Sequence, residues 1–140
     1  MRVLAIDAGA RRVGLAISDR SRTLARPLST IAVSSTDDAV DRVARVVEAL
    51  AAEEDGLDTI VVGLPARLDG TPTTSTSDVR AFIEGLAVRT SRTIVTADER
   101  LTSREAESRL AIRERDWRKR KDKLDAAAAA IILQEFLDRQ

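Results

Sequence analysis

The stretch VLAIDAGARRVGLAIS, residues 3–18, decides the fold that we predict for this chain. It holds two apolar runs, VLAID (3–7) and VGLAIS (13–18), with the continuous hydrophobic pattern of buried strands. The linking segment AGARR is too short for a crossover, so the two strands must pair antiparallel. A third strand is predicted at TLARPL (23–28), where Pro27 cannot donate to a ladder and therefore favours the sheet edge.

The remainder of the chain alternates helices with strands. Helices are expected at 35–56, with Ser35 or Thr36 as N-cap and Gly56 at the end, at 78–89, at 102–112, and from Asp125 onward. Strands are expected at 58–63 and 92–97, and a long polar loop at 63–77. The order predicts one α/β domain over residues 1–140, with a five-stranded mixed sheet (an antiparallel meander, then βαβ units) and helices on both faces. Right-handed crossovers make the ribonuclease H-like fold the natural candidate.

The composition narrows the chemistry that is open to the chain. Aromatic residues make up 2%, so the core must be aliphatic, and the formal net charge of zero gives no sign of a nucleic-acid partner. The absence of cysteine and histidine excludes disulfides, thiolate and imidazole ligands, and a Ser-His-Asp triad. Any metal site must use oxygen ligands, which suit Mg²⁺ or Mn²⁺. No apolar run approaches the roughly 20 residues that span a bilayer, so we expect a cytoplasmic protein with no membrane partner.

Acidic residues are predicted to gather at one edge of the sheet. Asp7 ends the first strand, Asp98 and Glu99 follow the last strand, and Asp125 starts the last helix. Each of these acids alone is better explained as a turn former or as a partner of the helix dipole. Together they would repel one another unless a cation lay among them. Two divalent ions about 4 Å apart could bridge such acids and a phosphodiester, which predicts a nuclease site.

Basic residues flank the same edge. The run WRKRKDK (117–123) carries five basic residues and the only tryptophan, which suits phosphate contacts and base stacking, although a solvated charged connection is the alternative. Gly9 allows close approach of a phosphate or simply forms a turn. The alanines of KLDAAAAAIIL (123–133) would let the last helix pack closely and fix Asp125. The candidate nucleic-acid contacts are Gly9, Arg11, Arg12, Arg100, Trp117, Arg118, Lys119, Arg120, Lys121 and Lys123, with Arg104 nearby.

Several of these motifs together resemble one known family over essentially the whole chain. IDAGARRVGLAISD (6–19), IVVGLP (60–65), LDGT (68–71), TADERLTSREAE (96–107) and KLDAAAAAIIL (123–133) occur in the order and spacing of the YqgF/RuvX family of Holliday-junction-resolvase-like proteins. The resemblance implies a ribonuclease H-like nuclease, dependent on Mg²⁺ or Mn²⁺, that processes the 5′ end of the 16S rRNA precursor. It also implies that Asp7, Glu99 and Asp125 are the catalytic acids, with Asp98 as a neighbour. Many members have asparagine near Arg67, so a substrate contact at that position would be altered here.

Other functions stay open at this point. A resolvase acting on branched DNA would need two active sites, and hence a homodimer rather than a monomer. A nucleic-acid-binding ribosome assembly factor would use the basic residues without catalysis. An ATP-binding module is suggested by the similar core and DxG loop of sugar kinases, but those proteins normally use two such lobes.

Overall fold

The computed structural model of the protein describes residues 1–64, 74–98 and 117–140. For residues 74–76, 98 and 117–125 within these ranges, it describes the backbone alone. The strands are β1 (Arg2–Ala8), β2 (Arg12–Ser18), β3 (Ala25–Ala32), β4 (Leu57–Leu64) and β5 (Thr93–Asp98). The helices are α1 (Thr36–Ala52), α2 (Thr74–Arg89) and α4 (Trp117–Asp138). No helix within these ranges is long and apolar enough to cross a membrane. The helix expected at 102–112 lies outside the described residues.

The strands form one mixed sheet in the order β3-β2-β1-β4-β5. β1 pairs antiparallel with β2 and parallel with β4, and β4 pairs parallel with β5. The predicted meander followed by parallel strands is thereby confirmed. Pro27 lies in β3, at the edge of the sheet and opposite Ala16 of β2, where the register shifts. An edge strand tolerates proline because its outer side has no ladder partner.

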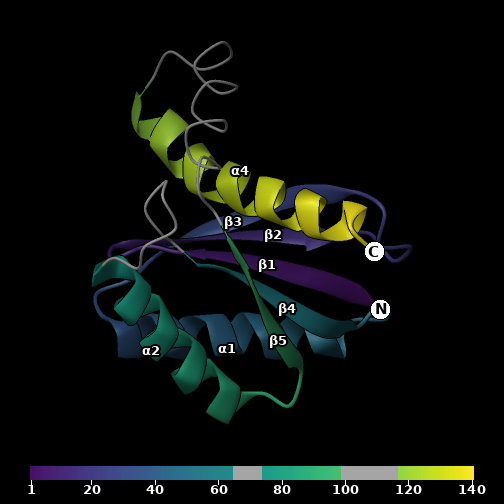
Figure 1. Ribbon diagram of the computed structural model, residues 1–140, viewed down its shortest axis with the longest axis horizontal. Coiled ribbons are helices and arrows are strands. Elements are labelled where there is room, and N and C mark those ends of the chain that lie inside the picture. The colour runs from purple at the N-terminus through teal and green to yellow at the C-terminus, as the bar shows by residue number, and fades with distance from the viewer. Residues whose placement is uncertain (65–73, 99–116) are drawn as a thin grey trace.

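Helices cover both faces of the sheet, with α1 and α2 on one side and α4 on the other (Figure 1). Successive residues of β1 alternate between these layers, as the pleat of a strand requires. Leu4 and Ile6 belong to the cluster beneath α1 and α2, whereas Val3 and Ala5 pack under α4. Burial of β1 on both faces explains why its sequence is continuously apolar.

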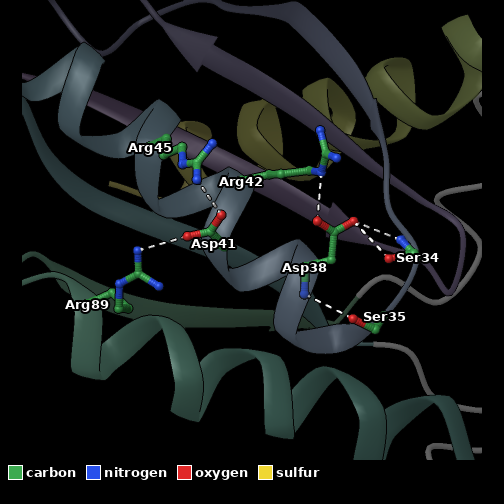
Figure 2. Close-up of polar contacts among 7 residues, drawn as sticks. All are labelled: Ser34, Ser35, Asp38, Asp41, Arg42, Arg45 and Arg89. Atoms are coloured by element: carbon green, nitrogen blue, oxygen red, sulfur yellow. Dashed lines mark hydrogen bonds and ion pairs between the residues drawn. The ribbon is translucent and has the colours of Figure 1, made fainter.

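The start of α1 is fixed by its side chains. Ser35 is the N-cap, and its hydroxyl accepts a bond of 3.1 Å from the backbone N–H of Asp38. The Asp38 carboxylate in turn accepts from the N–H of Ser34 at 2.9 Å and from Arg42 at 2.9 Å, and these contacts lower its pKa (Figure 2). Ser35, a residue favoured at the N-cap, therefore determines where α1 begins.

One carboxylate of α1 makes two ion pairs, one within α1 and one to α2. Asp41 accepts from Arg45, one turn further along α1, at 2.9 Å, and from Arg89 at the end of α2 at 3.3 Å (Figure 2). All three side chains are substantially exposed, so each pair stabilises the fold only weakly. The pair between Asp41 and Arg89 therefore joins the two helices but adds little to the stability of the fold.

The end of α1 is held by a buried arginine at the start of β1. Arg2 is 7% exposed, and its guanidinium donates to the carbonyls of Leu50 at 3.2 Å and Gly56 at 3.1 Å, and to the Glu53 carboxylate at 2.8 Å. The helix ends at Ala52, and Gly56, with φ +63°, forms the turn that follows it. Gly56 is thus required by the turn rather than by the helix terminus itself.

Two helices begin earlier than the sequence predicts. α2 starts at Thr74, so the last residues of the expected loop 63–77 are helical. α4 starts at Trp117, so Asp125 lies inside the helix, two turns from its start, and the expected helix start at Asp125 is wrong. The run 117–123 is helical because lysine and arginine have good helix propensity, although they leave no apolar periodicity to mark it.

The side chain of Gln134 fixes α4 against the edge of the sheet. Its amide oxygen accepts from the backbone N–H of Ala25 at 2.9 Å, and its amide nitrogen donates to the carbonyl of Thr23 at 2.9 Å. Ala25 is the first residue of β3 and pairs with Ser18. One glutamine therefore closes the ladder of the edge strand and sets the position of the helix along the sheet.

Candidate active site

Asp7 lies near the carboxyl end of the central strand and is half-buried. It follows Val3 and Ala5 in the alternation of β1, so its side chain is on the face of the sheet that α4 covers. Its partner in register on β2 is Gly14. Because glycine has no side chain, the β2 residue in register with Asp7 places no side chain beside it. A carboxylate with this setting can reach a ligand at the sheet edge.

Asp98 ends β5 at the same edge of the sheet. The register aligns Ile6 with Val62 and Val62 with Thr96, and it pairs Leu64 with Asp98. β1 and β5 are separated by β4 alone, so the backbones near Asp7 and Asp98 are about 10 Å apart, two strand spacings. Glu99 follows directly in the chain and lies outside the described residues.

The backbone of Asp125 lies toward the edge where β1 ends. Gln134 is at the opposite end of the sheet, where it contacts Ala25, and α4 runs from there back toward the end of β1 (Figure 1). Nine residues of helix cover about 13 Å, and the four steps from Val3 to Asp7 along β1 cover about the same length. The structure therefore brings the backbone position of Asp125 to the level of Asp7.

The geometry of the turn between β1 and β2 requires glycine at position 9. The N–H of Gly9 donates to the carbonyl of Arg12 at 2.9 Å, and a Cβ at Gly9 would lie 2.8 Å from that same oxygen. A real side chain does not tolerate such an approach to a backbone atom, so the fold alone requires glycine here. Arg11 is exposed in this turn, and Arg12 is half-buried at the start of β2.

The basic run is presented on a helix rather than on a loop. Residues 117–123 form the first turns of α4, and this end of the helix stands away from the sheet, on the side where β1 ends (Figure 1). Trp117, Arg118, Lys119, Arg120, Lys121 and Lys123 all lie in these turns. Arg100 and Arg104 lie outside the described residues.

The donor atoms available at this edge suit a hard divalent cation. Carboxylate oxygen is the ligand that Mg²⁺ and Mn²⁺ prefer, and the sequence offers no histidine or cysteine that would favour zinc. Within the described part of the chain, no three acids form a group that could hold an ion. The predicted group draws on Glu99, which is beyond that part, together with Asp7 and Asp125.

Sequence reasoning missed a cavity on the other face of the sheet. It has a volume of about 230 Å³ and lies between the β1–β2 turn and the starts of α1 and α2. Its lining residues are Ala8, Gly9, Ala10, Ser35, Thr36, Ala39, Asp78, Val79 and Phe82. The sequence predicts only helix-start roles for Ser35 and Asp78. A cavity depends on how helices pack against each other, and such packing produces no local sequence pattern.

Known proteins resemble the chain over its full length. A protein of Thermoanaerobacter pseudethanolicus named "Putative pre-16S rRNA nuclease" is 38% identical, over 100% of this chain and 98% of its own. A protein of Leifsonia xyli with the same name is 40% identical, over 98% of this chain and 85% of its own. Among solved structures, Thermus thermophilus RuvC in complex with a Holliday junction superposes with a TM-score of 0.58 at 18% identity, covering 99% of this chain and 94% of that one.

The structural likeness confirms the ribonuclease H-like fold that the element order predicts. The family described as "RuvX: Holliday junction resolvase" matches residues 1–139. That match spans nearly every residue, including all five of the motifs that suggested the family. The chain belongs to the RuvX family.

Proposed function

We propose that this protein is a metal-dependent nuclease that hydrolyses phosphodiester bonds, and that it processes the 5′ end of pre-16S rRNA in the cytoplasm. The observation that carries the proposal is the setting of Asp7, half-buried at the end of the central strand beside Gly14 and on the face covered by α4. The names of the relatives support the substrate. Fold likeness alone would not, because one fold serves many reactions.

In this proposal Asp7, Glu99 and Asp125 bind Mg²⁺ or Mn²⁺, with Asp98 as an additional ligand. When bound, the metal supplies a water of lowered pKa and positive charge at the leaving oxygen, which no side chain of this histidine-free protein supplies near neutral pH. The work of the protein is to hold the acids at one edge and to orient the phosphodiester. The aligned positions of Asp7 and Asp125 along β1 and α4 support this role.

The basic residues hold the nucleic acid in the same proposal. Arg118, Lys119, Arg120, Lys121 and Lys123 would bind phosphates from the first turns of α4, and Arg11, Arg12 and Arg100 would extend the positive charge; the helical placement of the run in α4 supports this role. Trp117 stacks on a base, and Gly9 allows the backbone to approach a phosphate. Contacts of this kind bind the phosphate backbone without reading sequence and weaken as salt is added.

Replacement of Asp7 tests the proposal directly. Asp7→Asn keeps the size of the side chain and removes the charge that holds the cation. We expect Mn²⁺-dependent cleavage of a 5′-extended 16S precursor fragment to fall about 100-fold or more, the scale for losing one electrostatic element of an active site. Glu54→Gln, an exposed acid in the turn after α1, is the matched control and should cleave normally. Full cleavage by a folded Asp7→Asn protein would reject the assignment.

A second candidate activity is resolution of branched DNA, which the description of the family favours. Symmetric cleavage of a four-way junction needs two active sites and therefore a homodimer. Paired nicks in a synthetic junction, made by a species of twice the chain mass, would establish this activity. Binding of precursor RNA that is unaffected by chelators, with cleavage of neither substrate, would instead indicate an assembly factor without catalysis.

A further inference from the structure

The cavity of about 230 Å³ lies immediately behind the proposed active edge. Ala8 and Gly9 in its wall directly follow Asp7 in the chain, but the alternation of β1 puts Ala8 on the side of α1 and α2. The cavity and the Asp7 carboxylate therefore open on opposite faces of the same strand end. A nucleic-acid strand that passes Asp7 at this edge could place a neighbouring base in the cavity.

The size and walls of the cavity suit one aromatic ring system. A protein cavity of about 150 Å³ is enough to bind benzene, so 230 Å³ leaves room for a larger planar ring. Ala8, Ala39, Val79 and Phe82 supply apolar walls, and the hydroxyl-bearing residues Ser35 and Thr36 stand at the exposed side. Extruded bases are held in this manner, between apolar side chains and a few polar groups.

The charge of the cavity decides which kind of group it accepts. Asp78 is exposed at the cavity, and within the described ranges neither a hydrogen bond nor an ion pair holds its carboxylate. A carboxylate accepts hydrogen bonds and repels anions, so the Asp78 carboxylate favours a hydrogen-bond donor over a phosphate beside it. The complementary ligand is an apolar ring with two adjacent N–H donors. The Watson–Crick edge of guanine has this form, whereas uracil and adenine lack the pair of donors.

We propose that this cavity, formed by the turn after Asp7 and the first turns of α1 and α2, binds one unpaired guanine of the RNA substrate, with Asp78 accepting its N1–H and N2–H donors. The inference rests on the proposed nucleic-acid function and adds a base preference to it. The site gives the enzyme a way to select a position on a strand that phosphate contacts alone cannot supply.

Binding of short RNAs tests the site. The pentamers UUGUU, UUIUU (in which inosine lacks the N2 amino group) and UUUUU are titrated in Mg²⁺ against protein carrying Asp7→Asn, so that the RNA stays intact. We expect UUGUU to bind about tenfold more tightly than UUIUU, the effect of one hydrogen bond to a charged group. Adding Asp78→Asn should abolish this difference. Adding Glu84→Gln, an equally exposed acid on α2 away from the cavity, should preserve it.

A second variant fills the cavity without touching the buried core. Ala10 is exposed at the cavity wall, and Ala10→Leu should reduce the preference for UUGUU over UUIUU. Equal binding of UUGUU and UUIUU by the parent protein, or a preference that survives Asp78→Asn, would overturn the guanine site while leaving the nuclease proposal intact. Failure to bind any of the pentamers, with precursor RNA also unbound, would overturn both.

Discussion

Asp19, in the turn between β2 and β3, is held by several hydrogen bonds. Its carboxylate accepts from the Ser21 hydroxyl and from the backbone N–H groups of Thr23 at 2.8 Å and Leu24 at 3.0 Å. These bonds, the one from Ser21 first, lower its pKa from 3.8 to about 2. The turn is tight enough that Arg22 adopts φ +60°, a conformation uncommon for a residue with a side chain.

Asp19 makes the stability of the turn depend on acid. Because its pKa is lower in the folded state than in the unfolded chain, the ionised group stabilises the fold above about pH 4, and this contribution disappears as pH falls toward 2. Asp19→Asn should therefore lower the thermal midpoint at pH 6, and the difference from wild type should shrink by pH 2.5. Glu54→Gln serves as the control. A difference that does not change with pH would contradict the argument.

Between elements, α1 and α2 pack closely at one glycine. A Cβ at Gly85 would lie 2.9 Å from Cγ2 of Val40, a residue that is 7% exposed. Gly85→Ala should lower the free energy of unfolding by about 1–3 kcal/mol, because overpacking outweighs the roughly 1 kcal/mol gained in helix propensity. Urea unfolding measures it. The pair Gly85→Ala with Val40→Ala should lose less than the sum of the single changes, and strict additivity would count against a direct clash.

The anchor of α4 is equally local. Gln134→Leu keeps the approximate shape of the side chain but removes the acceptor for the N–H of Ala25 and the donor to Thr23. We expect a loss of about 1–3 kcal/mol in urea unfolding, since a part-buried N–H is left without its partner. Glu135→Leu, on the exposed side of the same turn, should change stability little. Equal effects of the two changes would mean that Gln134 acts only through packing.

Elements differ in how well the sequence predicts them. The sequence predicts four of the strands, β1, β2, β4 and β5, because each is a short apolar run. Ser35 likewise identifies the start of α1. Hydrophobic periodicity does not predict the start of α4 at Trp117, because WRKRKDK has no apolar face. Periodicity alone cannot distinguish a charged helix from a charged loop. Helix propensity was the signal that could have identified it.

At the scale of the whole molecule, the architecture follows from the sequence further than the site does. The meander and the βαβ order fix which strand is central, and hence where Asp7 lies. The convergence of Asp7, Glu99 and Asp125 stays a prediction, because it depends on side-chain positions in segments that carry no local pattern. The cavity at Asp78 is a product of helix packing on helix, which no local rule encodes.

A shared metal site would also couple binding of the ion to folding of the whole domain. Crowded carboxylates repel one another when empty, so Mn²⁺ should stabilise the folded state, by about 2.7 kcal/mol when the free ion is at 100 times its dissociation constant. Differential scanning calorimetry should show the wild-type midpoint rising with Mn²⁺, and the midpoint of Asp7→Asn rising much less. An identical rise in both proteins would place the ion elsewhere on the molecule.

The position of α4 has a consequence for biosynthesis. The helix covers Val3, Ala5 and Ala16, which belong to the first strands to leave the ribosome, yet α4 is translated after every strand of the sheet. Until it emerges, the nascent chain exposes one apolar side of its central strand to water, a surface prone to aggregation. The same delay keeps Asp125 away from Asp7, so on the proposed mechanism a partly made chain would lack the complete set of acids and would not cut RNA before its own translation had passed residue 125.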